Sequence, residues 1–448
     1  MASIQGNLTE LRDGKIGRLL WNYSIPAVVG MLIMSLYNVI DRIFIGQGVG
    51  TEAIAGLAIT FPVMNIATAL GVLIGAGASA RVSIFLGAGD HDSAQLTLGN
   101  SMTLILINAI SYITVFAIFL DPILYAFGAS EQTIPYARDF MTYILPGLLI
   151  MNVGYTFNNI MRASGYPMKA MITMFIGAGC NVVLAPIFIF ALDMGIKGAA
   201  IATDISMLLF TVYVMHHFTR RSSTLHFRRG IFSLRRHIVI DILGIGAAPS
   251  LVNIAGCAIS IIINRNLLFH GGDNAVAAAG IFVTYTSLLT MVVVGICQGM
   301  QPIIGYNYGA GLLHRLRRTY LLAVISATAI VSAGALFGIL CPAIIARVFT
   351  TDTGLIAVTA NALTIAMSAF FVVGFQIVST TLFQSIGKVG KSIVLSLTRQ
   401  VVFLIPLLLV LSERYSLNGI WASFPLSDIL ATIVTAVLVI YQFRHLQK

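Results

Sequence analysis

The amino-acid sequence predicts an all-α integral membrane protein, with twelve transmembrane helices in two six-helix lobes. The lobes are expected to be related by a pseudo-two-fold axis and to flank a central cleft. Three observations lead to this prediction: the composition, the apolar segments and an internal repeat. The 448 residues are 58% hydrophobic and 9% charged, with a mean hydropathy of +0.94. Soluble domains carry about 25% charged residues, so an ordinary water-soluble protein is excluded.

The apolar segments are numerous enough for twelve membrane crossings, since each crossing needs about 20 apolar residues. We expect the crossings at residues 20–46, 53–86, 94–119, 133–161, 167–192, 196–218, 238–268, 275–306, 316–341, 354–384, 391–412 and 416–442. The N-terminal segment before them is polar and basic. It is not followed by a short apolar stretch with a small-residue cleavage site, so we expect no removable signal peptide.

An internal repeat divides the sequence into two similar halves. The repeated positions, 222 or 223 residues apart, pair Pro26 with Pro249, Asp41 with Asn264, Gly87–Gly89 with Gly309–Gly311, Gly165 with Gly387, and Lys169 with Lys391. Because each half has an even number of crossings, both enter the membrane in one orientation, and their symmetry axis follows the membrane normal. We expect an N-lobe at 1–219, an Arg-rich linker at 220–237 and a C-lobe at 238–448.

The positive charge of the chain is distributed unevenly across the predicted membrane. The net charge is +10, which by itself could indicate a nucleic-acid partner, and the six arginines of the linker could bind RNA or anionic lipid. With the N-terminus in the cytoplasm, however, about 20 of the 26 Lys and Arg residues fall on the cytoplasmic side, as the positive-inside rule requires. We therefore expect both termini in the cytoplasm and no nucleic-acid partner.

Asp41 is a carboxylate inside the otherwise apolar first crossing. A charged Asp at a helix centre costs about 2.5–3.5 kcal/mol on insertion scales, and such residues often mark an ion or proton path. Tyr37 precedes it by four residues and therefore shares its helix face. Pro26, in the same crossing, removes a backbone hydrogen bond and favours a bend. The alternative is an Asp41 at the outer helix end that reaches water beside Arg42.

The two halves differ at this position, because the residue equivalent to Asp41 is Asn264. The two side chains are nearly isosteric, but only Asp titrates. Two lobes around a cleft form the architecture of an alternating-access carrier, and this difference assigns ion coupling to the N-lobe. A structural pseudo-dimer without a transport role is the alternative.

Further polar residues in the predicted crossings are candidate ion or substrate ligands. They are Asp204, Asp428, Asn158, Asn181, Asn253, Gln298 and Gln301. A buried carboxylate has its pKa raised by desolvation, so Asp204 and Asp428 could exchange protons near neutral pH. We regard Asp204 as a candidate for ion coupling, and Asn158, Asn253, Gln298, Gln301 and Asp428 as candidates for the substrate cleft. Singly, such residues are more often helix–helix hydrogen bonds than ligand contacts.

Enzyme signatures are missing from the sequence. The segment 387–392, GKVGKS, has two residues between its glycines where a phosphate-binding loop needs four. There is no HExxH or GxSxG motif and no ATP-binding module. We expect neither an enzyme nor a cofactor, and a transporter of this kind would be driven by a proton or sodium gradient. A membrane-embedded enzyme or receptor is disfavoured by the same observations.

Four segments carry a resemblance to a known family: YNVIDRIFIG, GAGASARVSIFLGAG, MRASGYPMKAM and GMQPIIGYNYGAG. With twelve crossings in two lobes, the whole chain resembles the MATE (multidrug and toxic compound extrusion) family, in the style of its bacterial MepA-like and DinF-like members. The resemblance implies a cation-coupled antiporter that exports organic cations and amphipathic drugs while its lobes rock between inward-facing and outward-facing states. It also implies a monomer in the bacterial plasma membrane, with drugs and lipid as partners.

The resemblance also implies roles for individual residues. Asp41 would couple the ion, either a proton or a sodium ion bound near that carboxylate, and Pro26 would bend the first helix after protonation. The implied polar partners are Tyr37, Asn181 and Thr203. Similar proteins often read N-V-V-L-D-P in the fifth crossing, where this chain has Ala185 before Pro186. The second N-lobe carboxylate is thus missing, and Asp204 could replace it.

A flippase for lipid-linked oligosaccharide, from the related superfamily, is the alternative function. Such cavities tend to be cationic because they hold pyrophosphate. Here we expect the arginines in loops rather than within the membrane crossings, which disfavours the flippase.

Overall fold

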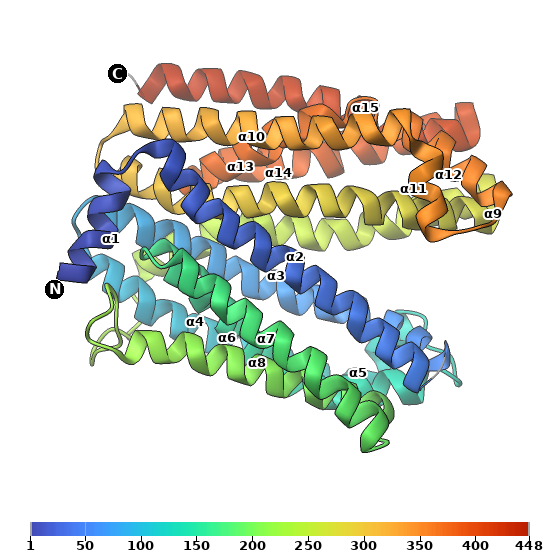
Figure 1. The fold of residues 1–448 in the computed structure, drawn as a ribbon, viewed down its shortest axis with the longest axis horizontal. Helices are drawn as coiled ribbons and strands as arrows, with labels where there is room; N and C mark the ends of the chain where they lie inside the picture. Colours follow the sequence, from blue (N-terminus) through green and yellow to red (C-terminus); the bar gives the residue numbers. More distant parts are fainter. Residues whose placement is uncertain (1, 50, 447–448) are drawn as a thin grey trace.

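The computed structural model describes residues 2–49 and 51–446, and its described part is almost entirely helical (Figure 1). The elements of the first half are α1 (Ala2–Asp13), α2 (Ile16–Gly48), α3 (Thr51–Gly87), α4 (His91–Ile118), α5 (Leu120–Ala126), α6 (Ile134–Ala163), α7 (Pro167–Pro186), η1 (Ile187–Ala191) and α8 (Gly195–Thr219). Those of the second half are α9 (Arg236–Gly309), α10 (Leu313–Leu340), α11 (Pro342–Phe349), α12 (Thr353–Ala366), η2 (Phe370–Val372), α13 (Val373–Ser385), α14 (Val389–Leu397), η3 (Thr398–Leu404) and α15 (Ile405–Leu446).

The twelve predicted crossings are confirmed. Within the described residues, nine helices are long and apolar enough to cross a membrane, and a tenth crossing is the bent pair α12–α13. Two of the nine are long enough for two crossings each. The 74-residue α9 breaks at Gly272, where φ is +65°, and the segment 389–445 breaks at Ser416, where φ is +51°. Together these elements supply twelve crossings.

Several local features were not predicted from the sequence. The tenth crossing was expected to be continuous over 354–384, but it is bent by 53° between α12 and α13. The fifth crossing ends in the π-helical turn η1 directly after Pro186, and the eleventh contains the π-helical η3. The short helices α5 and α11 follow the third and ninth crossings. Hydropathy does not detect such features, because the amino-acid composition hardly changes where the backbone hydrogen bonds switch from the α-helical to the π-helical pattern or where a helix bends.

The backbone carries the same repeat as the sequence. Gly89 and Gly311 both have positive φ, +75° and +71°, and each ends the turn after an equivalent crossing. Gly165 and Gly387 form a second such pair, with φ of +101° and +71°. L-residues with a Cβ rarely adopt this conformation. The repeat therefore preserves turn geometry as well as helix order.

The Arg-rich linker is packed onto the N-lobe. Asn100 of α4 donates to the carbonyl oxygens of Ile231 and Ser233 at 3.2 and 3.1 Å and accepts from the Arg235 amide at 2.7 Å. Arg228 pairs with Asp92 at 2.7 Å. The turn that leads into α4 is closed by Asp90, whose pKa is lowered by hydrogen bonds from Ser93. The linker thus follows the surface of the first lobe.

The two lobes touch through helices α2 and α3 on one side and α9 on the other. The contacts lie at the end of the molecule that carries both termini, which we call the closed end, and the lobes diverge toward the other end (Figure 1). Glycines permit the close approach. A Cβ on Gly77 or Gly246 would overlap the backbone of Ile242 or Leu73, respectively, and a Cβ on Gly309 would overlap that of Ile84.

The turn geometry that the two halves share can be tested with Gly89→Ala. Alanine at φ +75° is strained, so we expect the substitution to destabilise the protein by about 1 kcal/mol and to lower its thermal unfolding temperature. The matched control is Gly179→Ala in α7, where a Cβ meets open space and alanine is the better helix former. Equal unfolding temperatures for the two variants in detergent would contradict the assigned turn.

Candidate functional site

A polar cluster inside the N-lobe joins four of the residues predicted from the sequence. Asn181 of α7 is buried and donates through Nδ2 to Thr203 Oγ1 of α8 at 3.0 Å. Thr203 in turn donates to the Ala199 carbonyl oxygen at 3.0 Å. The buried side chain of Tyr37 lies beside Thr203 and interacts electrostatically with Asp41. Helices α2, α7 and α8 therefore position the cluster together.

Asp41 is half-buried in the part of α2 that diverges from the C-lobe. Its equivalent in the repeat, Asn264, is exposed on α9. The two positions thus differ in surroundings as well as in chemistry. The alternative in which Asp41 reaches water beside Arg42 involves a side chain, that of Arg42, which lies outside the described ones. The interaction of Asp41 with buried Tyr37 supports its place in the cluster.

Tyr155 of α6 is a member of this cluster that sequence reasoning missed. Its hydroxyl group donates to the Met34 sulfur at 3.7 Å, and its ring packs on Phe210 with centroids 5.2 Å apart. It also interacts electrostatically with Tyr37. A tyrosine within an apolar crossing is an ambiguous signal, because such residues also occur at membrane interfaces.

Asp204 follows Thr203 but points in another direction. Consecutive residues of a helix project about 100° apart, and the Asp204 carboxylate packs against Gly147 of α6. A side chain at Gly147 would overlap it, so this glycine makes room for the carboxylate. Asp204 is half-buried between α6 and α8. Asp204 is therefore a second N-lobe carboxylate next to the polar cluster, on the face of α8 that packs against α6.

Ala185 occupies the position at which the family resemblance leads us to expect a carboxylate. It is fully buried in an apolar cluster that also contains Ile45, Ile189 and Ala199. An ionised side chain there would be desolvated by these neighbours at a cost of several kcal/mol. The site around Ala185 is thus part of the hydrophobic core of the N-lobe.

Pro26 lies at the contact between the lobes. It is buried in α2, which is a continuous helix over Ile16–Gly48. Two neighbours of Pro26, Ser24 and Val28, face α9 so closely that a Cβ on Gly299 or Gly295 would overlap them. Since proline leaves one helical hydrogen bond unmade, the weakest point of the α2 backbone coincides with the interlobe contact.

Three of the predicted cleft residues belong to the closed end. Arg162, only 3% exposed, donates to Asn158 Oδ1 at 3.0 Å and to Gln298 Oε1 across the lobe boundary. Asn158 also donates to Thr173 Oγ1 at 2.6 Å, and Gln301 donates to the Ala76 carbonyl oxygen at 3.4 Å. These amides connect helices and bridge the two lobes where the lobes are in contact.

The other two predicted cleft residues lie elsewhere in the C-lobe. Asn253 is exposed and donates to the Pro249 carbonyl oxygen of its own helix at 3.0 Å. Asp428 is 2% exposed and accepts from Arg399 Nε at 2.6 Å. The structure therefore does not gather the five residues into one site.

The placement of two arginines corrects a prediction. We counted Arg399 on the cytoplasmic side and expected the arginines in loops, but Arg399 lies within η3 and pairs with buried Asp428. Arg162, also assigned to the cytoplasmic side, is buried between the lobes. The expectation that the arginines lie in loops is therefore wrong for Arg399, whereas Arg162 lies in the last turn of α6. Charge counting failed because a hydrogen-bonded partner can satisfy an arginine inside a helical bundle.

A second polar bridge at the closed end was not predicted from the sequence. Arg81 of α3 pairs with Asp241 of α9 at 2.6 Å. Both side chains are about a third exposed or less, at 26% and 35%. Each residue lies near the end of its own predicted crossing, and sequence spacing gives no sign that two such ends meet.

The Arg162 bridge can be tested through Gln298→Ala. A hydrogen bond to a charged group contributes roughly 1.5–3 kcal/mol. Its loss should therefore increase the fraction of molecules in which the closed end is open, and hence the labelling rate, about tenfold. The readout is maleimide labelling of a cysteine introduced at Ser24, which is 1% exposed there, in a protein lacking the native cysteines. Asn253→Ala is the control, because it removes an amide that stays on its own helix. Unchanged labelling in Gln298→Ala would refute the bridge.

The chain is similar over nearly its whole length to proteins of known sequence and structure. The Multidrug export protein MepA of Staphylococcus aureus is 25% identical over 433 residues, covering 95% of this chain and 94% of the relative. A structure of MATE in the bent conformation superimposes with a TM-score of 0.93 at 27% identity, covering 98% of both chains. A MOP superfamily transporter from Pyrococcus furiosus reaches 0.91 at the same identity and coverage.

The family comparison matches each half of the chain separately. The MatE model matches residues 26–187 and again residues 249–410. The second match begins and ends 223 residues after the first, which is the offset between Asp41 and Asn264. Together the two matches cover more than half of the sequence. The chain belongs to the MatE family.

Proposed function

We propose that this protein is a secondary active multidrug exporter, which uses an inward flow of protons or sodium ions to expel organic cations and amphipathic drugs. Family membership and relatives named as multidrug export proteins support a drug substrate. The single observation that carries the coupling proposal is the N-lobe cluster. It holds the carboxylate of Asp41 beside the buried hydroxyl of Tyr37, with no carboxylate at the equivalent C-lobe position.

Ion binding and helix movement are linked through α2 in this proposal. Asp41 and Tyr37 occupy the half of α2 that packs within the N-lobe, whereas Pro26 lies in the half that contacts α9. Neutralising Asp41 lowers the cost of burying it more deeply. The helix then shifts toward Thr203 and Asn181, and a change in its direction at Pro26 alters the contact with Gly295 and Gly299.

Alternating access follows from opening the closed end. The contacts that must separate are the packed glycines, the Arg162–Gln298 hydrogen bond and the Arg81–Asp241 ion pair. Each is a short-range contact, so a small rotation of the lobes would break them together. In this proposal the protein works as a monomer in the bacterial plasma membrane, and its termini and the closed end lie in the cytoplasm. The conformation in the structure is then the outward-facing state.

Asp41→Asn tests the coupling residue, since it copies the C-lobe side chain and keeps nearly the same shape. We expect proteoliposomes with this variant to lose gradient-driven efflux of a cationic dye. The amide of Asn carries no negative charge and does not take up or release protons near neutral pH. Asp92→Asn is the control: it alters an exposed carboxylate that pairs with Arg228 at the surface. Transport by Asp41→Asn at the rate of the unmodified protein would remove Asp41 from the mechanism.

Imposed gradients identify the coupling ion in the same proteoliposomes. A proton gradient without sodium, and a sodium gradient at equal pH, are applied separately to the unmodified protein. Efflux under one gradient alone assigns that ion, because a carboxylate with neutral oxygen ligands suits either one. Efflux that needs neither gradient would contradict the proposed ion coupling.

Tyr37→Phe tests the hydroxyl group of the cluster. Removing it takes a hydrogen-bonding partner from the neighbourhood of Asp41 and Thr203, and we expect the export rate to fall about tenfold. Tyr285→Phe is the matched control, since its hydroxyl donates to the Gly334 carbonyl oxygen at 2.8 Å within the C-lobe. If both variants slow export equally, the effect is a general loss of packing.

A further inference from the structure

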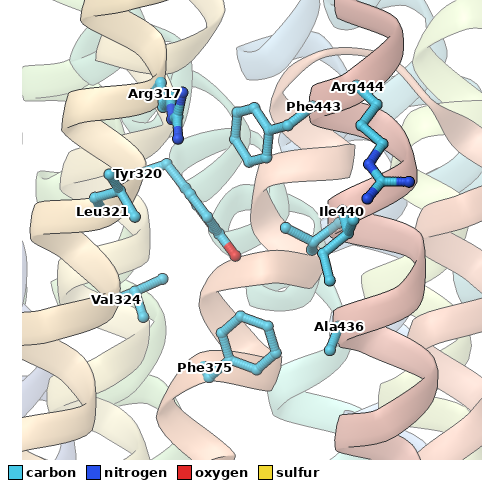
Figure 2. A pocket seen from close by; sticks show the side chains of 10 residues that line it. Arg317, Tyr320, Leu321, Val324, Phe375, Ala436, Ile440, Phe443 and Arg444 are labelled. Carbon is cyan, nitrogen blue, oxygen red and sulfur yellow. The ribbon is translucent and has the colours of Figure 1, made fainter.

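A groove of about 450 Å³ lies in the C-lobe between α10, α13 and α15 (Figure 2). Its apolar lining comes from Leu321, Val324, Phe375, Ala436, Ile440 and Phe443. Arg317 and Arg444 complete the lining at one end. The groove is distant in the sequence from every residue of the N-lobe cluster, and the proposed transport mechanism does not use it.

The charged and apolar parts of the groove are separated along its length. Figure 2 shows Arg317 beside the Phe443 ring and the guanidinium group of Arg444 near Ile440, with Val324, Phe375 and Ala436 farther along the helices. Arg317 lies in the second turn of α10, and Arg444 in the last turn of α15. Both arginines are therefore at the closed end, where the helices leave the membrane.

The arginines have no carboxylate partner in the described part of the chain. The five ion pairs found there involve other side chains. Residues 313–324 and 433–446, which form the two walls, contain no Asp or Glu. The mouth of the groove is thus positively charged and lacks a counter-charge.

The hydroxyl group of Tyr320, which lines the groove, already has a hydrogen-bond partner. The hydroxyl groups of Tyr320 and Ser379 are hydrogen-bonded to each other at 2.8 Å, and both residues are buried. The Tyr320 ring packs against Phe443 with centroids 5.4 Å apart. The apolar side chains contribute little to the binding of a free anion, and the arginines contribute nothing to the binding of an apolar molecule. An amphipathic anion would interact with both parts.

The surface around the groove is suited to lipid. Leu321 and Ile440 are 46% and 54% exposed, and Val437 on the same helix as Ile440 is 61% exposed. Large apolar side chains on a membrane-spanning helix are exposed in this way to acyl chains, because water would make such exposure unfavourable. The groove consequently opens toward the bilayer, with its charged end at headgroup level.

We propose that this groove binds one anionic phospholipid of the leaflet at the closed end. The phosphate lies between Arg317 and Arg444, and an acyl chain follows Leu321, Val324 and Ile440 into the membrane. Guanidinium groups bind phosphate oxygens through paired N–H donors, and juxtamembrane arginines favour anionic headgroups. The bound lipid thereby connects α10 to α15 across the groove.

The test uses the full-length protein in detergent, titrated with phosphatidylglycerol or with phosphatidylcholine of the same acyl chains. Native mass spectrometry measures the retained lipid. We expect phosphatidylglycerol to bind preferentially and the double variant Arg317→Ala/Arg444→Ala to bind it about tenfold more weakly. Arg318→Ala is the matched control, because Arg318 is adjacent in sequence but lines a different pocket with Asp13 and Lys15.

A second variant tests the acyl-chain part while keeping both arginines. Ala436→Trp fills the groove, and we expect it to reduce phosphatidylglycerol retention as strongly as the double variant does. Inorganic phosphate added in excess should not displace the lipid. The proposal is overturned if phosphatidylcholine binds equally well, if Arg318→Ala loses as much lipid as the double variant, or if Ala436→Trp retains it at the original level.

Discussion

The close approach of α3 and α9 at the closed end is the constraint on which the rest of the structure depends. Gly77, Gly246 and Gly309 bring backbone against backbone, and any Cβ at these positions would separate the lobes. In a membrane, helix association relies on such packing because lipid tails are as apolar as the side chains they replace. The contact is confined to one end, so the lobes can diverge at the other.

Polar interactions at the closed end add specificity to this apolar packing. The Arg162–Gln298 hydrogen bond and the Arg81–Asp241 ion pair cross between the lobes in the same region as the glycines. A buried guanidinium group is costly unless its donors are satisfied, and Arg162 loses an interlobe partner when the lobes part. These groups therefore favour the closed arrangement without making its opening prohibitive, since water can replace the lost partners.

The two lobes share a backbone plan but differ in their internal polar groups. The N-lobe places Asp41, Tyr37 and Thr203 among α2, α7 and α8, whereas the C-lobe encloses the ion pair of Arg399 and Asp428 between η3 and α15. A carboxylate paired with arginine already has its counter-charge, and a carboxylate beside hydroxyl groups can exchange an ion or proton. This difference in polar groups is the reason that the proposed mechanism places ion coupling in the N-lobe.

The sequence by itself determined the membrane class, the twelve crossings, the two-fold repeat and the carboxylate of Asp41 in one half alone, whereas Asn181 and Thr203 came only from the family resemblance. Hydropathy and repeat spacing are local properties, and they can be counted along the chain. Only the tertiary structure decided which polar residues meet. It placed Asn158 and Gln298 at the closed end, because hydrogen-bond partners are chosen across helices, and a sequence gives the face of one helix without the neighbour that covers it.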